Sequence, residues 1–310
     1  MSRVAVVDVG TNSTRLLIAD VTPDGGVTEL ERRTTITRLG QGVDHSARLA
    51  PEAMERVLAA LDTYKNLIDA HGVAATTAVL TSAVRDATNG ADFTDTIRQR
   101  FGFDAHMITG DEEARLTFRG ATSDRDPADH RRLAVFDVGG GSTELVVGRD
   151  QQVEFHVSTQ AGVVRQTERF LRHDPPTPEE LQLLAAEAAD IFTAAVPEDT
   201  RASVEAGIAV AGTATSAASI LQELEPYDPA RVHGFRLLRA QLEMLLARLA
   251  AMTEAQRREV TGLHPDRAPA IVAGLVLLIE AMRAFDLDEV EVSEHDILRG
   301  AALDRPAAAA

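Results

Sequence analysis

The feature that most constrains this chain is a stretch of sixteen residues that occurs twice. RVAVVDVGTNSTRLLI covers Arg3–Ile18, RLAVFDVGGGSTELVV covers Arg132–Val147, and the two agree at nine positions without a gap. In each copy a short apolar run ends at Asp-Val-Gly and a second strand-like run follows, which predicts a strand, a tight turn and a strand. We interpret the repeat as the mark of two domains related by duplication.

Strand and helix patterns alternate along the rest of the chain, which predicts an α/β fold. The length of 310 residues favours two domains, and the polar stretch SDRDPADHRR between the two repeat copies predicts their boundary. We therefore expect domains at 1–124 and 125–310. The other expected strands are 73–80, 105–109, 153–157, 207–211 and 289–292. The expected helices begin at Pro51, at Asp111 as cap, and at His295, and cover 163–171, 178–195, 238–252 and 268–285.

Composition and charge exclude several classes of protein. The chain has 31 basic and 48 acidic residues, a net charge of −17, which is the wrong sign for a general nucleic-acid binder. It has no cysteine, so disulfides, thiolate metal sites and cysteine nucleophiles are excluded. No apolar run reaches membrane-spanning length and the first residues enter a strand pattern directly, so we expect a cytoplasmic protein without membrane partners.

The repeated turn has chemistry suited to phosphate. Glycine after Asp-Val lets backbone N–H groups approach an anion, and the Ser and Thr hydroxyls add donors. Asp8 and Asp137 each end a strand with a carboxylate suited to Mg²⁺. One such turn alone is more often a plain hairpin, but its duplication with Asp retained favours a functional role. Two turns facing each other across an interdomain cleft would hold a phosphate chain from both sides.

Other phosphate-binding and hydrolase signatures are absent from the sequence. It contains no G-x-x-x-x-G-K-[ST], no G-x-G-x-x-G opening a helix, no G-x-S-x-G and no H-E-x-x-H. The remaining candidate is the phosphate-binding fold shared by actin, sugar kinases and Hsp70, the ASKHA superfamily. We therefore expect two actin-like, ribonuclease H-like α/β domains with an interdomain cleft.

Motifs along nearly the whole chain resemble the exopolyphosphatase and guanosine pentaphosphate phosphohydrolase family, in its short two-domain form. They are DVGTNSTR at 8–15, TRLGQG at 37–42, SAVRDATN at 82–89, ITGDEEARLTFRGA at 108–121, FDVGGGSTEL at 136–145, AGVVRQTERF at 161–170, AVAGTATSAA at 209–218 and DRAPAIVAGL at 266–275. One block departs from the family pattern, because SEHDILRGAAL at 293–303 has Asp296 where glycine is common.

The resemblance implies roles for individual residues. It implies that Glu113 is the general base for the attacking water, although by position alone Glu112 and Glu113 could simply complement the helix dipole. Asp137 matches a Mg²⁺ ligand, Glu144 a nearby acidic position of the same site, and Asp8 is a weaker metal candidate.

The remaining candidate site residues are expected to contact phosphate. The expected phosphate-binding residues are Gly10, Thr11, Asn12, Ser13, Arg85, Gly139, Gly140, Gly141, Ser142 and Thr143. Three arginines in family-like blocks are candidates for holding the distal part of the substrate: Arg38, Arg165 and Arg267. The nine histidines have no metal-ligand spacing, so we expect His233 and His295 to be surface or packing residues.

The resemblance implies a Mg²⁺-dependent hydrolase that removes the terminal phosphate of inorganic polyphosphate, guanosine pentaphosphate or both, acting as a homodimer. Two alternatives stay open. One is a phosphotransferase of the same superfamily, which would need an acceptor. The other is a non-catalytic sensor that binds polyphosphate or guanosine tetraphosphate, in line with the acidic charge and the departure at Asp296.

Overall fold

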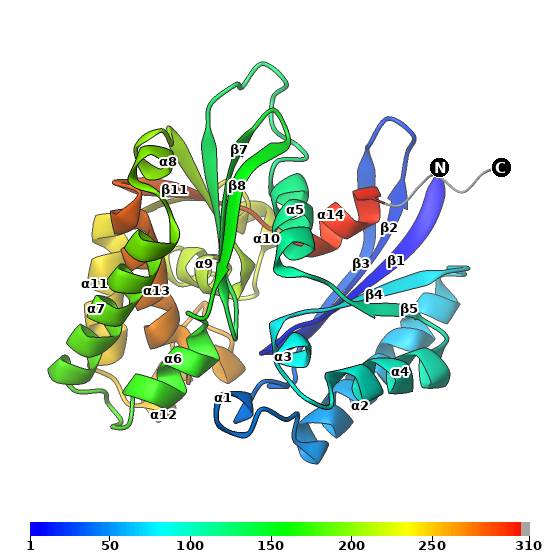
Figure 1. Cartoon of the computed structure of the whole chain (residues 1–310), viewed down its shortest axis with the longest axis horizontal. Coiled ribbons are helices and arrows are strands. Elements are labelled where there is room, and N and C mark those ends of the chain that lie inside the picture. The colour runs from blue at the N-terminus through cyan, green and yellow to red at the C-terminus, as the bar shows by residue number, and fades with distance from the viewer. Residues whose placement is uncertain (305–310) are drawn as a thin grey trace. The chain divides into compact units, whose positions relative to one another are not determined.

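The computed structural model describes residues 1–304, which form two compact units (Figure 1). Of the described residues, unit 1 contains Met1–Ser123 and Asp296–Asp304, and unit 2 contains Asp124–His295. The first boundary lies next to the predicted one. The second predicted domain, 125–310, needs a correction, because the chain leaves unit 2 after His295 and returns to unit 1. Residues 305–310 lie outside the described part of the chain.

Unit 1 is built on a five-stranded sheet of order β3-β2-β1-β4-β5, in which β1 is antiparallel to β2 and parallel to β4. The strands are β1 Ser2–Val9, β2 Ser13–Val21, β3 Val27–Ile36, β4 Thr76–Leu80 and β5 Asp104–Met107. The helices are α1 Val43–Ser46, α2 Pro51–Ala70, α3 Ser82–Arg85, α4 Gly90–Phe101, α5 Gly110–Ala121 and α14 Ile297–Asp304.

Helices cover both faces of this sheet, which explains why β1 is a continuous apolar run. Ala5 and Val7 belong to the apolar cluster that contains α2 and α4 residues. Val4 and Val6 belong to the opposite cluster, with residues of α5 and α14. Alternate side chains of one strand therefore need two different helical layers, and the last helix of the chain supplies part of the second.

Two glycines let α14 lie against α5 in unit 1. A Cβ atom on Gly120 would lie 1.9 Å from the carbonyl oxygen of Asp296, and one on Gly300 would lie 1.8 Å from that of Leu116. Because only glycine allows backbones to approach so closely, these residues fix where α14 packs. This contact is the physical reason for the corrected domain boundary.

Unit 2 is built on a six-stranded sheet of order β10-β11-β9-β6-β7-β8. Its strands are β6 Leu133–Val138, β7 Thr143–Arg149, β8 Gln152–Thr159, β9 Ala206–Val210, β10 Arg236–Leu238 and β11 Glu289–Val292. Its helices are α6 Val163–Phe170, α7 Pro178–Ala195, α8 Glu198–Ala202, α9 Ala211–Leu221, α10 Pro229–Val232, α11 Arg239–Ala250, α12 Glu254–Arg257 and α13 Ile271–Ala284, with a 3-10 turn η1 at Pro265–Arg267.

The two sheets repeat the same topology. The order β8-β7-β6-β9-β11 of unit 2 matches β3-β2-β1-β4-β5 of unit 1, with the same strand directions, and β10 is an addition at one edge. The β2–β3 pair has a register shift between Ile18 and Ala19, and the β7–β8 pair has one between Val147 and Gly148. These positions are equivalent in the sequence repeat, so even a local irregularity is shared, which supports duplication.

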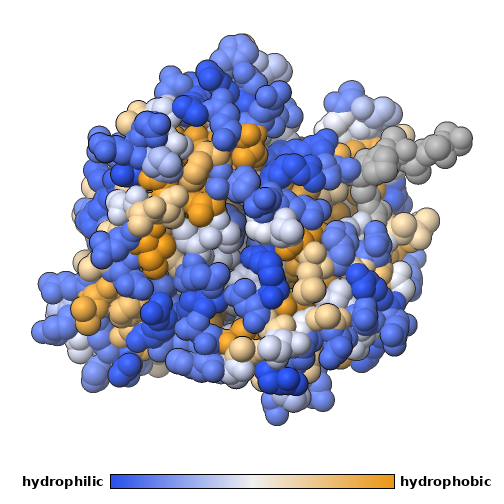
Figure 2. Space-filling model, viewed as in Figure 1, coloured by the Kyte–Doolittle hydropathy of each residue, from blue (hydrophilic) through white to orange (hydrophobic). Residues whose placement is uncertain are grey.

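The predicted α/β class is confirmed, with differences in detail. The cap of α5 is Thr109, whose hydroxyl accepts a hydrogen bond from the Glu112 N–H, and not the expected Asp111. The segment after β9 is already helical from Ala211. On the face drawn in Figure 2 hydrophilic residues predominate and hydrophobic ones form small separate patches. Among the described residues no helix has both the length and the hydropathy of a membrane span.

Candidate functional site

The first copy of the repeated turn joins β1 to β2 in unit 1. The Gly10 N–H donates to the Ser13 carbonyl at 3.0 Å, which closes the turn. The carbonyls of Thr11 and Asn12 accept from the N–H groups of Gly40 (2.8 Å) and Arg38 (2.9 Å). Within residues 1–304 the N–H groups of Thr11 and Asn12 themselves donate no hydrogen bond. The turn therefore points carbonyls into the unit and leaves two donors for a ligand.

The second copy of the turn joins β6 to β7 in unit 2 and has the same design. The Gly139 N–H donates to the Ser142 carbonyl at 3.0 Å. The carbonyls of Gly139 and Gly140 accept from Val163 N–H (2.9 Å) and Val164 N–H (2.8 Å) at the start of α6. In the described chain the N–H groups of Gly140, Gly141 and Ser142 donate to no protein acceptor. Three successive N–H groups of this kind form a nest for an anion.

Gly162 holds the second turn in place, and sequence reasoning gave it no role. A Cβ atom there would lie 2.2 Å from the Gly141 carbonyl carbon and 2.4 Å from the Ser142 nitrogen. Only glycine lets the start of α6 pack so closely on the turn. The Thr143 hydroxyl is fully buried and donates to the Ala161 carbonyl. It thus serves this packing, which removes the Thr143 side chain from the expected phosphate ligands.

Beside the second turn, two buried carboxylates lie on one face of the sheet. Asp137 of β6 and Glu144 of β7 are paired directly across the two strands, and both are less than a tenth exposed. Ser158 of β8 donates to Glu144 Oε1 at 2.8 Å. Like charges directly opposite on a sheet are unfavourable unless a cation lies between them. The donor set is all oxygen, which fits Mg²⁺.

The equivalent position beside the first turn has a built-in cation instead. Arg15 occupies in the repeat the position of Glu144, and its Nε and Nη2 donate to Asp8 Oδ2 at 2.8 and 2.6 Å. Its Nη1 donates to Asp296, at the start of the last segment of unit 1. Burial raises the pKa of Asp8, and the charge and hydrogen bonds of Arg15 offset part of that shift.

The two copies therefore differ in what they can bind. Asp8 Oδ1 is buried without a hydrogen-bond partner among the described residues, so Asp8 keeps one oxygen for a ligand. Its other oxygen is neutralised by Arg15, whereas Asp137 faces another carboxylate. Of the three predicted metal ligands, Asp137 and Glu144 fit a divalent cation best, and Asp8 stays the weaker candidate.

The expected base and the expected phosphate-contacting arginine of unit 1 form an ion pair. Arg85 Nη1 lies 3.0 Å from Glu113 Oε2 and donates to the Ile108 carbonyl, also at 3.0 Å. The Glu113 side chain is 9% exposed and lies in the first turn of α5. A carboxylate that only complemented a helix dipole would not need burial beside an arginine. The geometry thus favours a specific role for Glu113 over that alternative.

The three arginines expected to hold the distal substrate differ in their surroundings. Arg38 has a backbone φ of 49°, which is uncommon for a residue with a side chain, and in the described chain its guanidinium makes no ion pair. Arg165 Nε donates to the Gly141 carbonyl at 3.1 Å, so it lies against the second turn. The Arg267 guanidinium fills the space above Gly212, where a Cβ atom would lie 1.4 Å from its Nη1.

This chain is similar over nearly its whole length to known phosphatases. The model of the Ppx/GppA phosphatase family matches residues 17–304. Exopolyphosphatase 2 of Mycobacterium tuberculosis is 39% identical over 318 residues and both chains are 98% covered. The solved Ppx/GppA family member of Aquifex aeolicus is 30% identical with a TM-score of 0.81, covering 97% of this chain and 96% of that one. An exopolyphosphatase structure from Cytophaga hutchinsonii is 27% identical with a TM-score of 0.87, and both chains are 98% covered.

These matches confirm the predicted resemblance, and solved members of the family share the α/β fold of this chain. They also confirm the enzyme class, because relatives of this chain are named exopolyphosphatases, which hydrolyse phosphoanhydride bonds. The repeated turns, the buried carboxylates and the match over nearly the whole length lead to one conclusion: the chain belongs to the Ppx/GppA phosphatase family.

Proposed function

We propose that this protein is a Mg²⁺-dependent exopolyphosphatase that hydrolyses the terminal phosphate of inorganic polyphosphate. The observation that carries the proposal is the nest of three N–H groups at Gly140, Gly141 and Ser142, beside the carboxylates of Asp137 and Glu144. A nest binds a phosphoryl group through backbone N–H donors. It therefore needs no excess of basic side chains, which this protein of net charge −17 lacks. The relatives named exopolyphosphatases support this substrate.

Phosphate binding would use the two turns in the same way. The Thr11 and Asn12 N–H groups of unit 1 and the nest of unit 2 each donate to phosphoryl oxygens, with Ser13 and Ser142 adding hydroxyls. The Arg38 guanidinium, which makes no ion pair among the described residues, would pair with a distal phosphate. Arg165 and Arg267 would add positive charge near the second turn and near Gly212.

In the proposed reaction Glu113 accepts a proton from water while the water oxygen bonds to the terminal phosphorus. The P–O bond to the rest of the chain breaks, and the products are orthophosphate and a chain one phosphate shorter. Arg85 holds the Glu113 carboxylate in place through the 3.0 Å contact and stabilises phosphoryl charge. General-base catalysis of this kind contributes about 10²–10⁴-fold.

Asp137 and Glu144 would hold Mg²⁺, with Ser158 orienting Glu144. When bound, Mg²⁺ neutralises charge on phosphoryl oxygens and orients the phosphate for in-line attack. The Asp137 and Glu144 side chains thus link metal binding to phosphate binding, because both lie next to the nest. A Cβ atom on Gly139 would lie 4.0 Å from Glu144 Oε2, which shows how near the carboxylate is to the turn.

The test is orthophosphate release by the purified protein from polyphosphates of several lengths and from guanosine pentaphosphate, with and without Mg²⁺. We expect Mg²⁺-dependent release from polyphosphate with no acceptor present. Phosphate transfer that occurs only with an added acceptor would contradict the proposal and favour a phosphotransferase. Binding of polyphosphate or guanosine tetraphosphate with no turnover would contradict it in favour of a sensor. Guanosine pentaphosphate as a second substrate, the homodimer and the cytoplasmic location stay predictions.

A further inference from the structure

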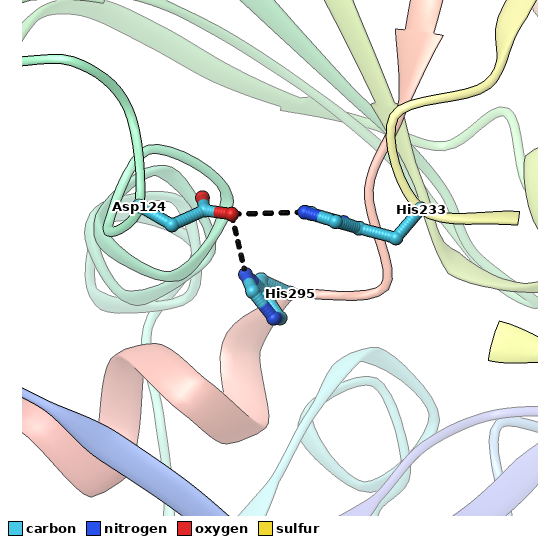
Figure 3. Close-up of side chains that lie close together, drawn as sticks. All are labelled: Asp124, His233 and His295. Atoms are coloured by element: carbon cyan, nitrogen blue, oxygen red, sulfur yellow. Dashed lines mark hydrogen bonds and ion pairs between the residues drawn. The ribbon is translucent and has the colours of Figure 1, made fainter. Parts of the chain in front are cut away.

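Unit 2 contains a cluster of side chains of metal-ligand type that shares no residue with the proposed phosphate site (Figure 3). Asp124, His233 and His295 point toward one another, each offering a ligand atom, and these atoms lie within 4.8 Å of one another. We propose that the cluster binds a first-row transition-metal dication of the zinc class. The three residues lie far apart in the chain, so the sequence predicts only surface or packing roles for His233 and His295.

The interatomic distances suit such an ion. Ligands about 2.1 Å from a tetrahedral zinc-class ion lie roughly 3.4 Å apart. His295 Nδ1 is 3.4 Å from Asp124 Oδ2 already, and His233 Nε2 is 2.8 Å from the same oxygen. A widening of the second distance by about 0.6 Å would accommodate the ion. Two imidazoles and one carboxylate are ligands that zinc accepts readily, while Mg²⁺ prefers oxygen alone.

The chain around the cluster holds the ligands in position. The Gly234 N–H donates to the Val292 carbonyl at 2.8 Å, which ties the residue after His233 to the end of β11. The His295 N–H donates to Ser293 Oγ at 3.0 Å, so the His295 backbone is fixed by a turn. The two imidazole rings also pack with centroids 4.4 Å apart. These contacts fix the backbone that carries the two histidines.

The charges around the cluster favour a cation. Burial alone would raise the pKa of Asp124, but the pairing with His233 and His295 outweighs burial and lowers it, so this carboxylate is ionised at neutral pH. The hydrogen bond to Asp124 raises the pKa of His233 despite burial, and the negative charges of Glu291 and Glu294 add to this. The local field thus stabilises positive charge, whether on imidazole or on a metal ion.

The surroundings of the His295 Nδ1 atom add to the argument. This atom is buried and makes no hydrogen bond of normal geometry among the described residues, although Asp124 lies 3.4 Å away. The 3.4 Å ion pair with Asp124 satisfies this buried ring nitrogen less well than a hydrogen bond of normal geometry would. A metal ion would satisfy it without a change in its burial.

Metal binding also requires His233 to give up the proton on its Nε2 atom. The Glu294 N–H donates to His233 Nδ1 at 3.3 Å, so His233 carries its proton on Nε2 and donates it to Asp124. Metal binding through Nε2 must displace that proton, either to solvent or to Nδ1. If the proton moves to Nδ1, the 3.3 Å hydrogen bond from the Glu294 N–H to that atom is lost. Affinity should therefore be moderate compared with a site preformed for metal.

The position of the cluster suggests what the ion would do. Asp124 is the first residue of unit 2 and His295 is the last. An ion bound to both would join the beginning and the end of this unit, with His233 of the α10–β10 connection as third ligand. Its effect would be to stabilise unit 2.

The experiment is titration of the purified, metal-free full chain with Co²⁺ and Zn²⁺ in a large excess of Mg²⁺, followed by calorimetry and by the visible spectrum of Co²⁺. We expect one ion per chain and a rise in thermal midpoint. Asp124→Asn, His233→Gln and His295→Gln should each weaken binding at least about ten-fold. The control is His173→Gln, since His173 also pairs with a carboxylate, Glu180, at 2.8 Å, but among residues 1–304 it belongs to no cluster of three possible ligands.

Circular dichroism must show that each variant is folded. Two different substitutions are made at each ligand, so that a folded variant is available if the other misfolds. Binding by the three variants equal to that of the native chain would overturn the proposal, as would no binding by the native chain. An equal loss of metal affinity in His173→Gln would also overturn the proposal, because the ion would then be held by scattered surface histidines. None of these readouts depends on phosphatase activity, so failure here and failure of the proposed function are distinguishable.

Discussion

Arg15 neutralises two buried carboxylates at once, so its removal should be among the most destabilising single changes in unit 1. Asp8 and Asp296 are each 3% exposed, and the Arg15 side chain is 16% exposed. Removing one partner of a buried ion pair costs about 3–5 kcal/mol, since the remaining charge is left uncompensated. We expect Arg15→Met to lower the free energy of unfolding by about 3 kcal/mol or more, measured by guanidinium denaturation.

The loss of stability in Arg15→Met should depend on pH in a defined direction. The folded-state pKa of Asp8 is already raised by burial, so ionised Asp8 destabilises the fold as pH rises through that pKa. Without Arg15, which lowers this pKa, the pKa rises further and the destabilised range extends toward neutral pH. The cost of Arg15→Met should therefore be largest near neutral pH and shrink as the solution is acidified and Asp8 takes up a proton.

A matched control and a second substitution sharpen the test. Arg33→Met removes an arginine that is 56% exposed and paired with Glu31, so it should cost less than about 1 kcal/mol. Asp296→Asn in the Arg15→Met background removes one uncompensated charge and should recover part of the loss. A loss in Arg15→Met no larger than in Arg33→Met, or a loss that does not change between pH 5 and 8 by more than about 0.5 kcal/mol, would refute the reasoning.

Three further predictions concern packing and the metal. Gly120→Ala should lower the free energy of unfolding by about 1–3 kcal/mol, because its Cβ would collide with the Asp296 carbonyl, and thermal unfolding that matches the native chain would contradict this. Thr143→Val should lower the free energy of unfolding by about 1–3 kcal/mol, because the Ala161 carbonyl loses the hydroxyl that donates to it. The KM for polyphosphate should stay unchanged. A raised KM with native stability would show instead that the Thr143 side chain contacts the substrate. Asp137→Asn and Glu144→Gln should each weaken Mg²⁺ binding, measured by calorimetry, at least about ten-fold. The control is Glu154→Gln on β8, which pairs with Arg132 and should leave Mg²⁺ affinity unchanged. Mg²⁺ affinities of the Asp137 and Glu144 variants equal to that of the native chain would exclude these two carboxylates as the metal site.

Much of the fold followed from local patterns. The repeat predicted both strand–turn–strand units, because apolar runs that end at Asp-Val-Gly are local signals. The helix at 178–195 and the strand at 289–292 match α7 and β11. In contrast β3 was not predicted, since VTELERRTTI is polar on both faces and largely exposed, so it lacks the alternation of a half-buried strand.

The parts of the site that could not be predicted depend on contacts between distant residues. The Arg15–Asp296 pair joins residues 281 positions apart, and no local pattern encodes it. The Asp124, His233 and His295 cluster is of the same kind. The sequence does contain one signal of the difference between the two carboxylate sites: alignment of the repeat places Arg15 opposite Glu144, a change in the sign of the charge.

The measurement that tests the central claim most directly is the turnover number of Glu113→Gln compared with Glu112→Gln on inorganic polyphosphate. The two residues are neighbours in the first turn of α5, but only Glu113 is buried against Arg85. We predict a loss of at least about 10²-fold in kcat for Glu113→Gln and little change for Glu112→Gln, with both variants folded and KM nearly unchanged. Orthophosphate release by Glu113→Gln at the native rate would contradict the account.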